Sequence, residues 1–166
     1  MKQLRTALMS IMLSCALVGC TSYGTSPKGL EVPIEQAALN FAADVRSGGY
    51  KIVSTEELKQ WLDQGRKMTI ISTILGSDDK AFGMIPNAVN SVIPRYEKEL
   101  TQAHKDNLLK VVGPDKDKTI ILYCGFVGCR RSHIGAKILV DAGFTNVYRY
   151  PGGITAWKEM DYPVIK

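Results

Sequence analysis

The chain has 166 residues, and its 21 Lys and Arg side chains against 16 Asp and Glu give a formal net charge of +5. That surplus is mild and suits small anionic substrates or lipid headgroups. No basic run is interleaved with aromatic residues, so we expect no nucleic-acid partner. The length is enough to bury one adequate core, which predicts a single folded domain.

The N-terminus reads as a bacterial secretion signal. Lys2 and Arg5 precede an apolar stretch, Ala7 to Val18, that is too short for a comfortable membrane span. The segment Leu17-Val18-Gly19-Cys20 resembles a lipobox, the motif of lipoprotein signals that are cleaved before a cysteine whose sulfur then carries lipid. The resemblance implies a signal peptide over 1–19 and lipidation at Cys20. A simple cleaved secretion signal is the alternative.

The residue after the lipobox and the segment that follows predict where the folded part would lie. Thr21, rather than Asp, follows Cys20. By resemblance to Gram-negative sorting this implies a cell-envelope protein, lipid-anchored to the outer membrane and facing the periplasm. Residues 20–31 are rich in Ser, Thr, Gly and Pro, which predicts a flexible tether. The folded domain is then expected over 32–166.

Helical and strand patterns alternate along that domain. Helices are expected at 34–45, from the Ser54-Thr55-Glu56-Glu57 capping box to Gly65, and at 96–112, 132–142 and 154–160. Strands are expected at 50–53, 68–75, the end of 84–90, 118–123 and 147–150. The segment from Gly76 to Gly83 is polar, and we assign no element to it. This alternation predicts an α/β fold with a mostly parallel central sheet and helices on both faces.

One loop stands out at the end of the strand that precedes the 132–142 helix. Cys124 follows the apolar run Thr119 to Tyr123, and two arginines lead into the helix. Ligands of such sheets bind beyond the carboxyl ends of the strands. A helix N-terminus contributes up to about 2 kcal/mol, which would lower the pKa of a cysteine thiol from roughly 8.5 towards 7. Cys124 is therefore the candidate nucleophile, and an inert buried cysteine is the alternative.

The cysteine count supports a functional reading of this loop. Cys15 would leave with the signal and Cys20 would carry lipid, so Cys124 and Cys129 would be the remaining thiols. A structural bridge usually ties distant segments, whereas a bridge inside one short loop constrains little. Function explains the pair better. His104 and His133 are the only histidines; we expect both to face solvent and expect no metal site.

Several motifs in the last third of the chain resemble a rhodanese domain. They are Arg131-Ser132 opening a helix, Ala142-Gly143-Phe144, Val147-Tyr148 and Gly152-Gly153-Ile154-Thr155-Ala156-Trp157. A weaker match, Gly83-Met84-Ile85-Pro86-Asn87-Ala88, stands where rhodaneses carry Gly-His-Ile-Pro-Gly-Ala. The resemblance covers about 50–164 and implies a rhodanese-like fold.

What the resemblance implies is sulfur transfer. Rhodanese-like enzymes take a sulfane sulfur from a donor such as thiosulfate, hold it as a persulfide on the loop cysteine, and pass it to a thiol or cyanide. Cys124 would be that cysteine. The expected substrate-binding residues are those of the loop, whose amides would cradle the terminal sulfur and whose arginines would orient an anionic donor: Gly125, Phe126, Val127, Gly128, Cys129, Arg130 and Arg131. No cofactor is expected, and a monomer is the default.

Two departures from the rhodanese pattern keep alternatives open. The loop between Cys124 and Arg131 is longer than usual, and Ser72-Thr73-Ile74 replaces the Asp-Val-Arg of many rhodaneses. Cys124 to Arg130 also fits CxxxxxR, the phosphate-binding pattern of cysteine phosphatases and arsenate reductases. A redox protein that cycles Cys124 and Cys129 between dithiol and disulfide is a second alternative. A non-catalytic binding module is a third.

Overall fold

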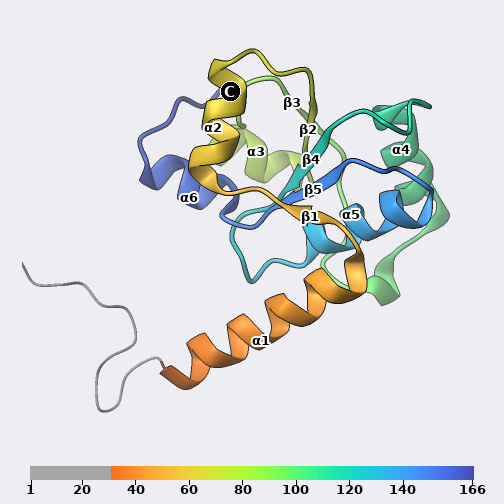
Figure 1. Cartoon of the computed structure of the whole chain (residues 1–166), viewed down its shortest axis with the longest axis horizontal. Coiled ribbons are helices and arrows are strands. Elements are labelled where there is room, and N and C mark those ends of the chain that lie inside the picture. The colour runs from red at the N-terminus through yellow and green to blue at the C-terminus, as the bar shows by residue number, and fades with distance from the viewer. Residues whose placement is uncertain (1–30) are drawn as a thin grey trace, which may run out of the picture.

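A five-stranded parallel sheet forms the centre of the protein. The structure is a computed structural model, and it describes residues 31–166. Within these residues the strand order is β1-β5-β4-β2-β3, and every pair is parallel (Figure 1). The strands are β1 (Lys51–Ile52), β2 (Thr69–Ser72), β3 (Ala88–Asn90), β4 (Ile120–Tyr123) and β5 (Val147–Tyr150). The predicted α/β fold with a parallel sheet is confirmed.

Helices cover both faces of this sheet. They are α1 (Glu31–Gly48), α2 (Thr55–Asp63), α3 (Gly76–Phe82), α4 (Gln102–Val112), α5 (Arg131–Asp141) and α6 (Gly153–Glu159). Figure 1 shows α2 and α6 on one side of the sheet and α4 and α5 on the other. Because two parallel strands can be joined only by a crossover connection, strands and helices alternate along the chain, and the helices bury both faces of the sheet.

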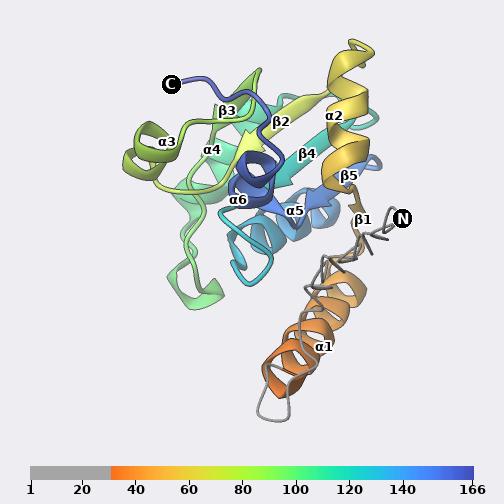
Figure 2. The ribbon, with the colours of Figure 1, turned by 90° about the vertical axis from the view of Figure 1, so that its left-hand side faces the viewer.

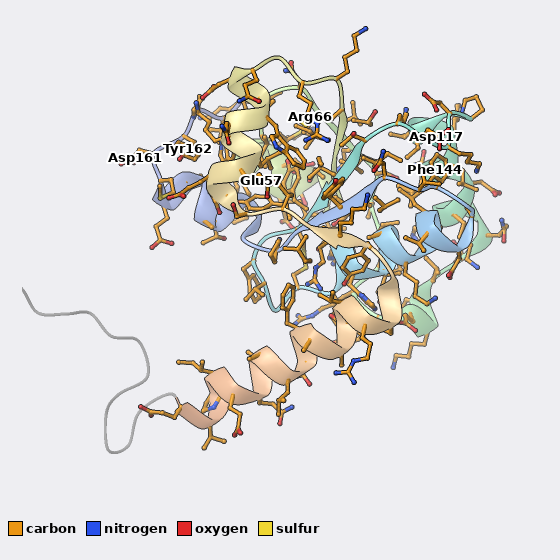
Figure 3. The ribbon with its side chains drawn as sticks, in the orientation of Figure 1. Glu57, Arg66, Asp117, Phe144, Asp161 and Tyr162 are labelled. Carbon is orange, nitrogen blue, oxygen red and sulfur yellow. A yellow bond between two sulfur atoms is a disulfide. The ribbon has the colours of Figure 1, made fainter. Side chains whose placement is uncertain are left out.

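The two central strands β2 and β4 send alternate side chains into two separate cores. In β4, Ile120 and Leu122 pack with the residues of α4 and α5, whereas Ile121 and Tyr123 pack with those of α2 and α6. This period of two follows from the pleat. Figure 3 labels residues from the two ends of the molecule: Tyr162 lies near α2, and Phe144 lies at the far end near α4. The strand is buried at every position, as its unbroken apolar sequence predicts.

Two segments differ from their sequence predictions. The helix expected over 96–112 is a short 3-10 helix, Glu97–Glu99, followed by α4. Thr101 separates them because its hydroxyl caps the new helix and accepts from the backbone N–H of His104. The polar segment after Gly76, to which we assigned no element, forms α3. Its buried Asp79 accepts a hydrogen bond from Ser72 at 2.7 Å, which ties this polar helix to the sheet.

Helix α1 begins away from the body and ends against it. Figures 1 and 2 both show its first turns projecting beyond the sheet and the other helices. The apolar face predicted for this helix is largely exposed, and only Phe41 and Val45 of that face are half-buried. Its last turns pack on α5. None of the helices within 31–166 is long and apolar enough to cross a membrane. The expected signal peptide and Cys20 lie outside the described residues.

Candidate active site

The loop of residues 124–130 sits at the carboxyl end of β4, in the middle of the sheet. Cys124 directly follows Tyr123, the last residue of β4, and only 1% of its surface is exposed. Helix α5 begins at the other end of the loop, at Arg131. The sequence prediction of a cysteine between a buried strand and a helix start is therefore correct. Parallel sheets bind ligands beyond the carboxyl ends of their strands, which is where this loop lies.

Cys124 is joined to Cys129 by a disulfide inside this loop. The two Cα atoms are 6.2 Å apart, and both cysteines are buried. Cys124 thus carries no thiolate in this form, and its predicted lowered pKa concerns the reduced protein and stays a prediction. The redox alternative requires the two sulfurs to reach each other, and here they are bonded. Reduction would release two thiols side by side.

The middle of the loop forms one wall of a groove. Phe126 and Val127 are exposed, with 54% and 46% of their surfaces accessible, and Gly128 is exposed beside them. The backbone N–H of Cys129 donates to the Phe126 carbonyl at 3.0 Å, so this amide is used within the loop. The groove has a volume of about 700 Å³, and helix α1 forms its other wall: Pro33, Gln36, Ala37, Asn40, Phe41, Ala43 and Asp44. An opening of this size admits a small molecule beside the loop.

The segment that replaces the family's Asp-Val-Arg supports the loop from below. The Thr73 hydroxyl donates to the Tyr123 carbonyl at 2.7 Å, and the Thr73 backbone N–H donates to the same oxygen at 3.0 Å. Ile74 packs against both cysteines in a small buried cluster. The base of the loop is therefore fixed by a hydroxyl and an apolar side chain, in place of the charged pair that the rhodanese pattern would supply.

The start of α6 holds the first two residues of the loop. The backbone N–H of Ile154 donates to the Cys124 carbonyl, and that of Thr155 donates to the Gly125 carbonyl, each at 3.0 Å. Gly153 makes this approach possible. Its φ is +62°, and a Cβ there would lie 2.7 Å from the Gly125 carbonyl carbon. Only glycine combines this dihedral with this closeness.

A buried arginine of β5 holds the other end of the loop, and sequence reasoning missed it. One guanidinium nitrogen of Arg149 donates to the carbonyls of Val127 and Cys129, at 3.0 and 3.3 Å. Another forms an ion pair with Asp44 of α1 at 3.2 Å. The side chain is fully buried, so its charge needs these partners. The available signal was a lone charged residue within the apolar strand Val147–Tyr150.

The two arginines of the loop have partners within the protein. The Arg130 guanidinium lies 3.1 Å from the Asp44 carboxylate and 3.4 Å from that of Glu97, with 48% of its side chain exposed. Arg130 also lines the groove. Arg131 is half-buried and donates to the Ile93 carbonyl. Arg130 is thus the loop arginine that an anion in the groove can reach.

The expectation that both histidines face solvent is wrong. His104 is half-buried at the start of α4, and His133 is buried in α5 with only 1% exposed. His133 lies between α1, the segment before β1 and the 3-10 helix, and the Tyr50 hydroxyl lies 2.9 Å from His133 Nδ1. Burial lowers the pKa of His133, while the nearby Asp44 carboxylate opposes this shift.

Hydrogen bonds around Tyr50 indicate which His133 nitrogen carries the proton. Arg149 donates to the Tyr50 oxygen at 3.2 Å, so the Tyr50 hydroxyl is free to donate to His133 Nδ1. The neutral ring then carries its proton on Nε2, which faces Asp44 and Glu97 at 3.7 and 3.8 Å. Burial also raises the pKa of Tyr50, against the opposing hydrogen bond from Arg149. Within 31–166, no three His, Cys, Asp or Glu side chains gather as a metal site.

The family match agrees with this architecture. The sequence profile described as "Rhodanese-like domain" matches residues 54–160, which is more than half of the chain. This chain belongs to the rhodanese-like family. The matched range starts at the cap of α2 and ends just after α6, so it contains the cysteine loop and Arg149 but not Asp44 or α1. Helix α1 lies outside the matched range and borders the candidate active-site loop.

Named relatives of this rhodanese-like domain include a probable sulfurtransferase and a tRNA hydroxylase. It is 30% identical over 111 residues to the probable adenylyltransferase/sulfurtransferase MoeZ of Mycobacterium tuberculosis, covering 67% of this chain and 25% of that one. It is 28% identical over 114 residues to the tRNA uridine(34) hydroxylase of Bordetella parapertussis, covering 68% and 44%. The chain thus spans less than half the length of these relatives.

Solved structures show the same fold. The polysulfide-sulfur transferase homodimer of Wolinella succinogenes superimposes with a TM-score of 0.57 at 19% identity, over 82% of this chain and 89% of that one. This likeness confirms the rhodanese-like fold.

Proposed function

We propose that this rhodanese-like domain is a sulfurtransferase that moves a sulfane sulfur from an anionic donor, such as thiosulfate, to a thiol or cyanide acceptor through a persulfide on Cys124. The observation that carries the proposal is the position of Cys124, directly after the central strand of a rhodanese-like sheet and at the start of a closed loop. The sulfurtransferase among the relatives supports it.

The reaction requires the reduced loop. The Cys124 thiolate attacks the outer sulfur of thiosulfate, the sulfur–sulfur bond of the donor breaks, and sulfite leaves with the electron pair. The product is a Cys124 persulfide anion. Backbone N–H groups of residues 125–130 that are free of internal bonds would stabilise its charge. The acceptor then takes the outer sulfur and restores the thiolate.

Arg130 is the residue that we assign to orientation of the donor. Its guanidinium borders the groove and is half exposed. Its partner Glu97 is exposed, so a dianion such as thiosulfate can compete for the guanidinium. Arg131, held by the Ile93 carbonyl, would support the start of α5. No resident cofactor is part of this reaction.

The test uses the full chain, reduced and freed of reductant. Incubation with thiosulfate is expected to release sulfite and to add the mass of one sulfur atom to the peptide that contains Cys124 when Cys129 is replaced by Ser. Cys124→Ser is expected to release no sulfite. If neither thiosulfate nor polysulfide transfers sulfur to the reduced chain, sulfur transfer is the wrong function.

We also propose that the protein is a monomer held in the cell envelope by lipid on Cys20, at the outer membrane and facing the periplasm. The lipobox-like segment and Thr21 support this placement. Cys20→Ala should move the protein from the membrane to the soluble fraction. Light scattering in detergent reports the oligomeric state.

A further inference from the structure

We propose that Cys129 is a resolving thiol, which discharges the Cys124 persulfide as hydrosulfide and leaves the Cys124–Cys129 disulfide. This rests on the proposed function, and it names the acceptor of the sulfur step as a thiol of the same loop. The reaction would make the domain a sulfane-sulfur reductase driven by an external dithiol. The observation behind it is that the candidate nucleophile is bonded to the second cysteine of its own loop.

The surroundings of the two cysteines isolate them from large acceptors. They are the only cysteines in residues 31–166. Cys124 is 1% exposed and Cys129 is 9% exposed, and Ile74 packs against both. In the oxidised form Cys124 is shielded from solvent and bonded to Cys129, so Cys129 is the thiol nearest to Cys124 once the loop is reduced.

The loop backbone is held independently of the disulfide. At one end, the Cys124 carbonyl accepts from Ile154, and at the other, Arg149 donates to the Cys129 carbonyl. Opening the sulfur–sulfur bond leaves these anchors in place, with the two Cα atoms 6.2 Å apart. The Cys129 thiol therefore stays next to Cys124, and its attack has the advantage of an intramolecular reaction.

The step balances as a thiol–disulfide exchange. The Cys129 thiol loses its proton, and its sulfur attacks the inner Cys124 sulfur of the persulfide. A bond forms between the two cysteine sulfurs while the inner–outer sulfur bond breaks, and the outer sulfur leaves with the electron pair and the proton as hydrosulfide. Cys129 is oxidised and the sulfane sulfur is reduced. An external dithiol then reduces the disulfide and becomes a disulfide itself.

A purely structural bridge explains the pair less well. The disulfide joins two residues that are 5 positions apart in the sequence, in a loop whose ends are already fixed by β4 and α5. It therefore constrains the chain less than a bridge between distant segments would. It also blocks the nucleophile that the family uses. A disulfide that removes the Cys124 thiolate is consistent with one state of a catalytic cycle that passes through both the reduced and the oxidised loop.

A single-turnover experiment tests the proposal. The full chain is reduced, freed of reductant without air, and mixed with thiosulfate; sulfite, sulfide and the trapped state of the cysteine peptide are measured over time. We expect the wild type to release one sulfite and one sulfide per chain and to end as the Cys124–Cys129 disulfide. Release of sulfite and sulfide should resume when dithiothreitol is added. The sulfide rate should be independent of protein concentration, because the step is intramolecular.

Variants of Cys129 separate this proposal from the proposed function. Cys129→Ser and Cys129→Ala should still release sulfite but keep the persulfide, with sulfide release slower by at least about ten-fold. Sulfide release from either variant at the wild-type rate, or a wild type that keeps its persulfide, would overturn the role of Cys129 and leave sulfur transfer standing. Absence of sulfur uptake in every form would instead overturn both. The wild-type stoichiometry decides the matter even if a variant folds poorly.

Discussion

Arg149 is the buried charged residue that joins the cysteine loop to α1 and to Tyr50. Its buried guanidinium joins Asp44 of α1, Tyr50 before β1, and the carbonyls of Val127 and Cys129 in the loop. A buried charge is costly unless it is paired and hydrogen-bonded, and the cost of removing one partner is that the others are left unsatisfied. Arg149 therefore links the stability of the domain to the shape of the loop.

We predict that Arg149→Met lowers the free energy of unfolding by about 3–5 kcal/mol, the range for breaking a buried ion pair. Urea denaturation of the oxidised protein measures this. Asp44→Asn combined with Arg149→Met should cost less than the two single changes added together, since each single change leaves its partner unpaired. The more exposed pair of Lys137 and Asp141 supplies the control: Lys137→Met should cost less than about 1 kcal/mol. Equal losses from both Met variants would contradict the role given to Arg149.

The sequence predicts Cys124 as the candidate nucleophile but does not predict the residues that hold its loop. Cys124 was recognisable because a strand pattern, a glycine-containing loop and a helix start are consecutive in the chain. Arg149 was not, since its hydrogen-bond partners are 17 to 105 residues away along the chain. The prediction for His133 was wrong because burial of a helical residue depends on which segments pack over it, and Tyr50 and Asp44 lie far from it in the sequence.

At the scale of elements, the approach of α6 to the cysteine loop is the most demanding contact. The turn before α6 brings Gly153 within van der Waals distance of the Gly125 backbone, and two amides of α6 then bond to loop carbonyls. The chain offers a matched position at the end of α5. Gly143 also has a positive φ, +86°, but a Cβ there would meet nothing within 4 Å.

We predict that Gly153→Ala is worse than Gly143→Ala in both stability and sulfur transfer. Gly143→Ala should cost about 1–2 kcal/mol, because a side chain is strained in the left-handed region. Gly153→Ala adds a collision with loop backbone, so its cost should exceed about 2 kcal/mol and its sulfite release from thiosulfate should slow. Urea denaturation and the single-turnover assay measure the two effects. Slowed sulfite release in both variants alike would show that strain, and not the contact, matters.

Elements with strong local signals were predicted well. The strand at Val147–Tyr150 and the helices α2 and α5 match their expected ranges closely, because apolar runs, a capping box and helical spacing are local properties. Elements whose ends or existence depend on a side-chain hydrogen bond were not predicted. The break before α4 depends on the Thr101 cap, and the existence of α3 depends on a contact between Asp79 and the sheet.

At the scale of the whole molecule, a polar network that is buried at His133 and Arg149 and open to solvent at Glu97 joins α1, α5 and the sheet beneath the loop. Asp44, Arg130 and Glu97 face the edge of His133, while Tyr50 and Arg149 complete its surroundings. These groups come from segments far apart in the chain, and Asp44 lies outside the range that the family profile matches. The network thus ties α1 to β5 and to the cysteine loop.

This network predicts how stability depends on pH. Burial lowers the pKa of His133 below its ordinary value of 6.5 in the folded protein. Below about pH 6.5 the unfolded chain therefore binds a proton that the folded protein does not, and stability falls as the pH falls, with a slope of up to about 1.4 kcal/mol per pH unit from this one group. Above that pH both states hold the neutral ring and the group contributes no slope. Once the pH is below the lowered folded value, both states are protonated and the loss stops.

His133→Asn tests this prediction, because its amide can accept from the Tyr50 hydroxyl near the position of Nδ1 but does not titrate. The free energy of unfolding of the oxidised protein is measured by urea denaturation between about pH 7.5 and 5.5, above the range where carboxylates take up protons. The wild type should lose stability across this window and the variant should lose less, whatever its absolute stability. A wild-type slope that persists unchanged in His133→Asn would mean that other groups carry the dependence, and that protonation of His133 is tolerated because Asp44 and Glu97 compensate the charge in the folded state.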